Sequence, residues 1–179
     1  MIKGPLIVTG CQRSGTAFVT RALAHDLELE VFGDKDFLPT PTNIEKLAIL
    51  IDHGITNIIV QCPSALNMFV DLYYMLPGVC FVGVMRDTED IVSSMKRISW
   101  RSEDIYHWPD YMYDHVAMMN RNWESLKVIL PESCWTEVQY TDFKDHPLFV
   151  PKEHRQLFTV NQWSPFETCG PATYPRNLT

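Results

Sequence analysis

The chain has 179 residues, 46% of them hydrophobic and 21% charged, and a formal net charge of −7. This length and composition are typical of one globular domain, and we expect a single domain over residues 1–179. The negative net charge argues against nucleic acid as a partner, so a phosphate ligand requires a local positive site.

No apolar run approaches the roughly 20 residues that a membrane-spanning helix needs, and the first residues show no signal-peptide pattern. The five cysteines form no CxxC pair and have no metal-ligand spacing. We therefore expect a cytoplasmic protein with reduced cysteines, without a membrane span and without a bound metal.

Short apolar runs alternate with segments of helical period along most of the chain. Strands are predicted at PLIVTG (5–10), LELEVF (27–32), NIIVQC (57–62), VCFVGVM (79–85) and CWTEVQY (134–140), and helices at about 15–26, 43–53, 65–76, 88–98 and 112–130. Such alternation, with strands apolar throughout, predicts a three-layer αβα fold whose mostly parallel sheet is covered on both faces. From about residue 144 onward, frequent prolines and weak periodicity predict an irregular tail on the same domain.

The segment VTGCQRSGTAF (8–18) has the outline of an anion-binding loop between a strand and a helix. Gly10 and Gly15 allow tight turns and a close approach to the anion, and the helix start adds the positive end of its dipole. Nucleoside-triphosphate loops follow GxxxxGK[ST], but Thr16 stands at the lysine position and Arg13 supplies the charge. We therefore predict a shorter, metal-free anion as the ligand. The alternative is a simple turn with a locally satisfied arginine.

A second signal lies in RDTEDIVSSM (86–95), after the fourth predicted strand. Arg86 stands at the carboxyl end of that strand, the edge where ligands bind in open α/β sheets, and Ser94 follows on the next helix. A guanidinium group and a hydroxyl form a suitable grip for a second phosphate group. The alternative is an ion pair of Arg86 with Asp87 or Asp90 at the helix start.

Three segments together resemble one family in order and spacing: QRSGT (12–16), RDTEDIVSS (86–94) and EVQYTDF (137–143). The family is that of the sulfotransferases that use 3′-phosphoadenosine 5′-phosphosulfate (PAPS), and the loop is most like the PRSGT-type loop of tyrosylprotein and bacterial members. The resemblance covers roughly residues 5–147. It implies a P-loop type of fold, PAPS as a co-substrate without a required metal, and sulfuryl transfer to an acceptor hydroxyl that the sequence does not identify.

The resemblance also implies roles for individual residues. The 5′-phosphosulfate is expected on the loop and helix start, and the 3′-phosphate on Arg86 and Ser94. Tyr140 is expected near the nucleotide, with a buried strand tyrosine as the alternative. The loop and helix-start residues are Gln12, Arg13, Ser14, Gly15, Thr16 and Ala17.

Sulfuryl transfer requires a base for the hydroxyl and a cation near the leaving oxygen. The family lysine after the third strand is replaced by Gln61, so the predicted cation is Arg13 or Lys35. The predicted base is Asp34 or Asp36, in the segment matched to the family glutamate. Histidines that remain as alternatives without motif support are His25, His107 and His115.

Two other functions stay open at this point. One is a small P-loop kinase using ATP and Mg²⁺, although Thr16 does not supply the counter-charge that a γ-phosphate needs. The other is a non-catalytic nucleotide-binding relative, which the replacement of the family lysine by Gln61 suggests.

Overall fold

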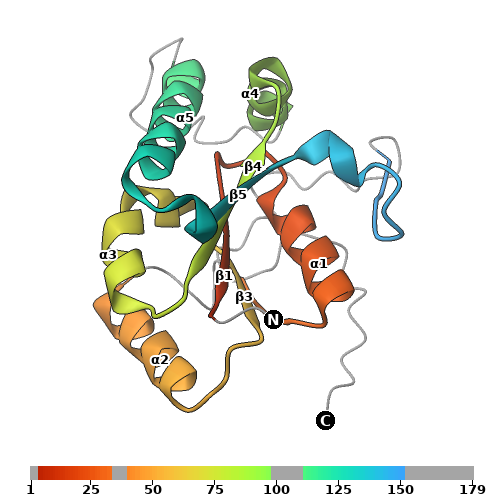
Figure 1. Ribbon diagram of the computed structural model, residues 1–179. Helices are drawn as coiled ribbons and strands as arrows, with labels where there is room; N and C mark the ends of the chain where they lie inside the picture. The colour runs from red at the N-terminus through yellow and green to blue at the C-terminus, as the bar shows by residue number, and fades with distance from the viewer. Residues whose placement is uncertain (1–3, 34–39, 98–110, 152–179) are drawn as a thin grey trace.

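The computed structural model describes residues 4–33, 40–97 and 111–151, and Figure 1 shows how their helices and strands are arranged. In chain order the elements are β1 (Leu6–Thr9), α1 (Thr16–Leu27), β2 (Glu30–Phe32), α2 (Pro41–Asp52), β3 (Ile58–Gln61), η1 (Pro63–Asn67), α3 (Phe69–Met75), β4 (Cys80–Met85), α4 (Thr88–Arg97), α5 (Tyr111–Ile129), η2 (Glu132–Cys134), β5 (Trp135–Gln139) and η3 (Tyr140–Phe143). The sheet order is β2-β3-β1-β4-β5, and all neighbouring pairs are parallel. The predicted α/β fold with a parallel sheet is therefore confirmed.

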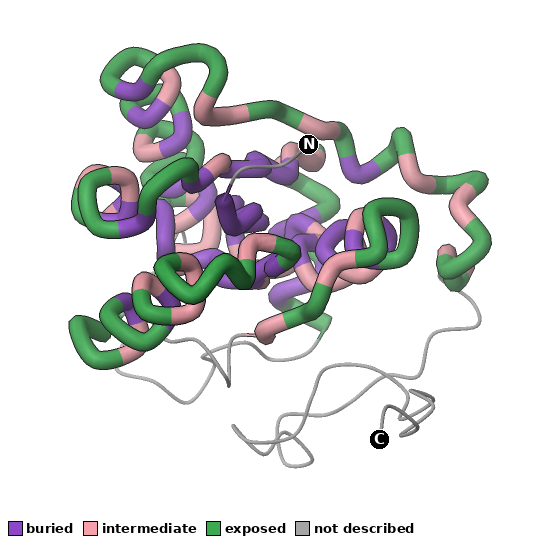
Figure 2. The backbone as a smooth tube through the Cα atoms, turned by 60° about the horizontal axis from the view of Figure 1, so that its bottom comes forward, coloured by how far each residue is buried: buried purple, intermediate pink, exposed green. Residues whose placement is uncertain are grey.

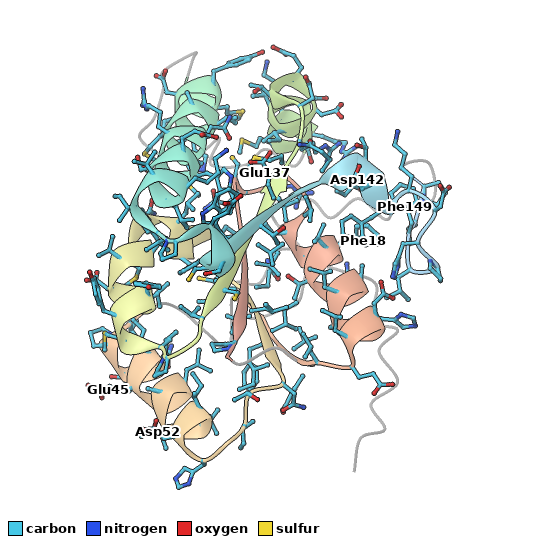
Figure 3. All side chains as sticks on the ribbon, in the orientation of Figure 1. Phe18, Glu45, Asp52, Glu137, Asp142 and Phe149 are labelled. Atoms are coloured by element: carbon cyan, nitrogen blue, oxygen red, sulfur yellow. The ribbon has the colours of Figure 1, made fainter. Side chains whose placement is uncertain are left out.

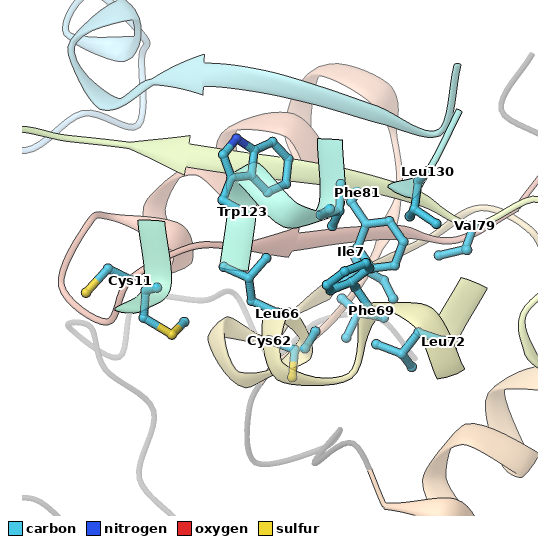
Figure 4. Packing of buried hydrophobic residues seen from close by; sticks show 14 of the residues in the cluster. Ile7, Cys11, Cys62, Leu66, Phe69, Leu72, Val79, Phe81, Trp123 and Leu130 are labelled. Carbon is cyan, nitrogen blue, oxygen red and sulfur yellow. The ribbon is translucent and has the colours of Figure 1, made fainter. Parts of the chain in front are cut away.

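Different helices cover the two faces of the sheet. α1 lies on one side, whereas α2, α3 and α5 lie on the other (Figure 1). Because side chains alternate along a strand, Ile7 of β1 faces the larger core, while its neighbour Val8 packs in the smaller core with α1. In the larger core, Phe81 of β4 lies beside Ile7, and Trp123 of α5 belongs to the same cluster (Figure 4). The buried apolar surface of these two cores stabilises the three layers.

The central strands are buried, but the edge strands are not. Every residue of β1 is buried, as are most of β3 and β4, whereas β2 and β5 contain only exposed and half-buried residues. The expectation of strands covered on both faces is therefore wrong for β2 and β5. Each has a neighbour along one side only, and the helices pack over the middle of the sheet, where buried segments gather in Figure 2.

Local signals explain where the helices begin and end. The Thr40 hydroxyl accepts a hydrogen bond from the Asn43 amide (3.3 Å) and caps α2. The predicted helix over 65–76 is instead two shorter elements, η1 and α3. Met68 between them has φ −143° and ψ 31°, which interrupts the helical hydrogen-bond ladder. Among the helices that the structure describes, none has the length and apolar character to span a membrane.

Residues 144–151 form turns, and some of them contact α1. The Phe18 ring of α1 meets the Phe149 ring edge to face at 5.6 Å (Figure 3). At the far end of α1, Asp26 Oδ1 accepts hydrogen bonds from His25 Nδ1 (2.9 Å) and His146 Nε2 (3.2 Å). These contacts tie the described part of the tail to α1.

We expect Asp26→Asn to remove a pH-dependent part of the stability. Hydrogen bonds from His25 and then His146 hold the pKa of the Asp26 carboxyl below its ordinary value of 3.8. A lowered folded-state pKa stabilises the folded protein above the ordinary value, and this stabilisation is lost as the pH falls through the folded-state pKa. Urea denaturation should show a gap between wild type and variant at about pH 6 that closes toward about pH 3.

The matched control is Glu45→Gln on α2, because Glu45 is an exposed carboxylate and the change in net charge is the same. A gap between wild type and Asp26→Asn that does not vary with pH would contradict this account of the Asp26 contacts.

Candidate functional site

The segment between β1 and α1 forms a glycine loop, defined here as residues 10–15. Gly10 and Gly15 have φ values of 139° and 107°, and Arg13 between them has φ 71°, which is uncommon for a residue with a side chain. A Cβ atom at Gly10 would lie 2.8 Å from the carbonyl oxygen of Val84, and one at Gly15 would lie 2.3 Å from the Tyr140 ring. Both conformation and space therefore require glycine at these two positions.

The glycine loop lies where the strand order of the sheet reverses. β1 and β4 are neighbours, but the chain leaving β1 continues to β2 at one edge, and the chain leaving β4 continues to β5 at the other. In open α/β sheets, ligands bind at this point, outside the carboxyl ends of the strands. The two segments singled out in the sequence, the loop after β1 and the segment after β4, therefore meet at one place.

The start of α1 has the properties of an anion site. Within the described chain, Gly15 caps α1 without a side-chain hydrogen bond. The Phe18 amide donates to the Gly15 carbonyl (3.0 Å), and the two helix-start amides before it, those of Thr16 and Ala17, point toward an external acceptor. The Ser14 amide donates to the Cys11 carbonyl (3.0 Å). The Ser14 hydroxyl is fully buried and has no partner among the described residues. An unsatisfied buried hydroxyl costs roughly 1–3 kcal/mol, which a ligand oxygen would remove.

Two residues after β4 reach back to the glycine loop. Arg13 Nε donates to the Ser94 hydroxyl on α4 (3.3 Å), and Arg86 Nη1 donates to the Arg13 carbonyl oxygen (3.4 Å). Residues predicted for two phosphate groups are thus in direct contact. Both hydrogen bonds are long, so an anion between these groups offers shorter, charge-assisted bonds instead.

The Arg86 side chain is held by several groups. Its Cζ lies 4.6 Å from the centroid of the Tyr140 ring, and its Nη2 lies 3.4 Å from Asp90 Oδ2. The ion pair at the helix start, considered above as the alternative, is therefore present together with the contact to the glycine loop. Arg86 Nε is buried without a partner in the described part of the chain, and it remains as a donor for a ligand.

Tyr140 follows β5 directly and lies against the glycine loop. Its ring is 9% exposed and packs between Gly15 and the Arg86 guanidinium group. The buried tyrosine that the sequence offered as the alternative is therefore present, and its ring lies against the glycine loop. A place for Tyr140 near a nucleotide stays a prediction.

The other predicted residues lie at the expected strand and helix ends. Thr16 is the first residue of α1 and is buried, and Ala17 follows it. The Thr16 carbonyl oxygen accepts a hydrogen bond from the Thr20 hydroxyl (2.8 Å). Gln61 ends β3 opposite Val8 of β1. It therefore lies beside the strand that leads into the glycine loop.

The structure adds His115 to the site, a residue for which the sequence showed no motif. Its Nε2 is hydrogen-bonded to the Gln12 side-chain oxygen of the glycine loop. The His115 ring also stacks on the Tyr111 ring, with centroids 6.1 Å apart and planes at 28°. The sequence signal that could have indicated its position is weak: His115 directly precedes Val116, a buried residue of α5.

Four candidates lie outside the described residues: Asp34, Lys35, Asp36 and His107. The strand before the first three, β2, ends at Phe32 and is two strands away from β1 in the sheet. Their catalytic roles stay predictions.

Cys11 lies in the glycine loop but is buried behind it. Burial raises the pKa of the Cys11 thiol to about 12, so the thiol stays protonated at neutral pH. A protonated thiol is a poor nucleophile, and Cys11 serves as a small apolar residue of the larger core.

Within the described chain, one group of three possible metal ligands comes together: His25, Asp26 and His146. It lies about 14 Å along α1 from the glycine loop, at 1.5 Å per residue. The Leu148 amide donates to Nδ1 of His146 (3.1 Å), which leaves the proton on its Nε2. The protonated Nε2 donates to Asp26 and has no lone pair for a metal ion. The three residues are therefore a hydrogen-bonded cluster that holds the turn segment against α1, rather than a metal site.

No family model matches the sequence, and no curated protein matches it. Among solved structures, a sulfotransferase domain from the curacin biosynthetic pathway has a TM-score of 0.59 at 13% identity, over 80% of this chain and 69% of that one. A gluconokinase from Sinorhizobium meliloti 1021 has a TM-score of 0.46 at 16% identity, over 77% and 83% of the two chains. A sugar kinase from Janibacter sp. HTCC2649 has a TM-score of 0.47 at 14% identity, over 76% and 84%. At 13% identity the likeness to the sulfotransferase domain concerns the fold alone, an α/β fold with a parallel sheet.

We expect Ser14→Ala to act in opposite directions on stability and on anion binding. Without ligand, removing a buried hydroxyl that lacks a partner should leave the protein unchanged or stabilise it by up to about 1 kcal/mol. With inorganic pyrophosphate, the lost hydrogen bond should weaken binding about tenfold. Urea denaturation and calorimetry measure the two effects.

Ser125→Ala is the control, because this hydroxyl is exposed on α5, away from the glycine loop, and donates to the Arg121 carbonyl of its own helix (2.9 Å). If Ser14→Ala clearly destabilised the protein without ligand, the Ser14 hydroxyl would have a structural role and the anion site would lose this support.

Proposed function

We propose that this protein is a sulfotransferase that moves a sulfuryl group from PAPS to an acceptor hydroxyl. The observation that carries the proposal is the contact of Arg13 with Ser94 and Arg86 at the start of α1. It gathers two guanidinium groups at a loop of P-loop type in which Thr16 replaces the lysine. Such a site suits a ligand with two separate anionic groups and no γ-phosphate, and PAPS has a 5′-phosphosulfate and a 3′-phosphate.

In the proposed complex, the 5′-phosphosulfate lies on the glycine loop. The Ser14 hydroxyl and the first-turn amides of α1 bind its oxygens, and the 3′-phosphate binds Arg86 and Ser94. The buried Nε of Arg86 supports this arrangement, because a phosphate oxygen supplies the acceptor that this donor lacks among the described residues. When the 3′-phosphate accepts a hydrogen bond from the Ser94 hydroxyl, the present bond between Arg13 and Ser94 is replaced. The Arg13 guanidinium group can then bind the bridging oxygen of the phosphosulfate.

The proposed reaction is an in-line displacement at sulfur. The acceptor oxygen forms a bond to sulfur while the bond from sulfur to the bridging oxygen breaks, and the electron pair leaves on the 5′-phosphate. Arg13 stabilises the charge that develops on this oxygen. Gln61 brings an amide and no charge, so Arg13 is the proposed cation, with Lys35 as the second candidate.

We expect the desulfated product, 3′-phosphoadenosine 5′-phosphate, to bind at least about tenfold more tightly than AMP. A charge-assisted contact to the 3′-phosphate contributes roughly 1.5–3 kcal/mol, or one to two decades of affinity. Calorimetry with both nucleotides measures the difference. Ser94→Ala should narrow it, whereas Ser93→Ala should not, because Ser93 is the exposed neighbour of the buried Ser94.

Three results would count against the proposal. Equal affinity for the two nucleotides removes the 3′-phosphate assignment. Tighter binding of ATP with Mg²⁺ favours a P-loop kinase. Tight binding of the desulfated product without any sulfuryl release from PAPS favours a non-catalytic relative.

A further inference from the structure

The Arg86 guanidinium group has one edge that is only partly used. Its Nη1 donates to the Arg13 carbonyl oxygen (3.4 Å), and its Cζ lies 4.6 Å from the centroid of the Tyr140 ring. Its Nη2 lies 3.4 Å from Asp90 Oδ2, whereas its Nε is buried without a partner among the described residues. At the edge formed by Nε and Nη2, a guanidinium group can bind a phosphate with two parallel hydrogen bonds. Asp90 therefore holds one of the two donors that a phosphate at this edge would use.

The Asp90 carboxylate is a loosely held partner. Its side chain is 61% exposed, against 16% for Arg86, and the two residues are four positions apart along the chain. Exposed ion pairs of this kind contribute little to stability, because water and salt screen them. The backbone of Asp90 is anchored separately, since its amide donates to the Asp87 carboxylate (3.1 Å). The Asp90 carboxylate can therefore leave Arg86 while the start of α4 keeps its cap.

Arg86 has other contacts that hold it in place. The Tyr140 ring and the Arg13 carbonyl oxygen come from the segments after β5 and β1, and neither contact involves Asp90. A phosphate at the Nε and Nη2 edge would keep both contacts. It would also lie close to the Asp90 carboxylate, and two negative charges a few ångströms apart repel each other. Repulsive groups beside a site lower its affinity for one ligand relative to another.

We propose that Asp90 competes with the 3′-phosphate for Arg86, and so limits the affinity of the site for PAPS and for its desulfated product. The inference rests on the proposed function, which assigns this phosphate to Arg86 and Ser94. In the ligand-free protein, the Asp90 carboxylate pairs with Nη2 of Arg86. When the phosphate binds Nε and Nη2, the carboxylate moves toward solvent and repels the bound anion. Asp90 thereby favours release of the product, after which a new PAPS molecule can bind.

The test measures binding of 3′-phosphoadenosine 5′-phosphate and of AMP to the full chain by calorimetry. Asp90→Asn keeps the size of the side chain and removes its charge. We expect this variant to bind the bisphosphate about fivefold more tightly, because a repulsion near the protein surface is removed. Its affinity for AMP, which lacks the 3′-phosphate, should change by less than about twofold. In stopped-flow experiments, the bisphosphate should leave the variant about fivefold more slowly than it leaves the wild type.

Asp87→Asn is the matched control. Asp87 is exposed at the same helix start, the change in net charge is the same, and an asparagine oxygen can still accept the Asp90 amide. Both affinities of this variant should stay within about twofold of wild type.

Three results would overturn the inference while the proposed function stands, provided that wild type prefers the bisphosphate to AMP. Weaker binding of the bisphosphate to Asp90→Asn would mean that Asp90 orients Arg86 for the phosphate. An unchanged affinity would mean that the two anions do not compete. An equal gain in Asp90→Asn and Asp87→Asn would reflect net charge alone. If neither wild type nor Asp90→Asn prefers the bisphosphate, the 3′-phosphate assignment of the proposed function fails, and this inference fails with it.

Discussion

The ring of Tyr140 is the contact on which the candidate site depends. It follows β5, packs against Gly15 where a Cβ would lie only 2.3 Å away, and faces the Arg86 guanidinium group at 4.6 Å. Arg86 in turn donates to the carbonyl oxygen of Arg13. The left-handed backbone of Arg13 costs roughly 1–3 kcal/mol, and contacts such as this one must offset that cost. One ring thus joins the segments that follow β1, β4 and β5.

The parallel strand order makes this contact possible. β1, β4 and β5 are consecutive in the sheet, so their carboxyl ends lie within two strand spacings, about 10 Å. Side chains from the segments after these strands therefore gather at one edge. The molecule carries a net charge of −7, yet this edge holds two arginines in contact. Local placement, rather than total charge, decides that an anion is favoured there.

α1 connects the glycine loop with the segments that follow β5. Its Phe18 ring contacts the rings of Tyr140 at 6.0 Å and Phe149 at 5.6 Å. In the last turn of the same helix, Asp26 accepts a hydrogen bond from His146 of the turn segment. The start of α1, where an anion would bind, is therefore supported by aromatic packing, and the end of α1 by hydrogen bonds.

The sequence by itself determined the features whose signals are local. Apolar runs and helical periods located the strands and most helices, and glycine spacing located the loop. The position of Arg86, directly after an apolar strand, indicated that it belongs to the site. Only the tertiary structure decided the exposure of β2 and β5 and the break at Met68. It also decided two contacts between distant residues: Arg13 with Ser94, 81 residues apart, and Gln12 with His115, 103 residues apart. The reason is physical: strand order and helix docking follow from packing of the whole core, and no local period encodes which side chains meet across it.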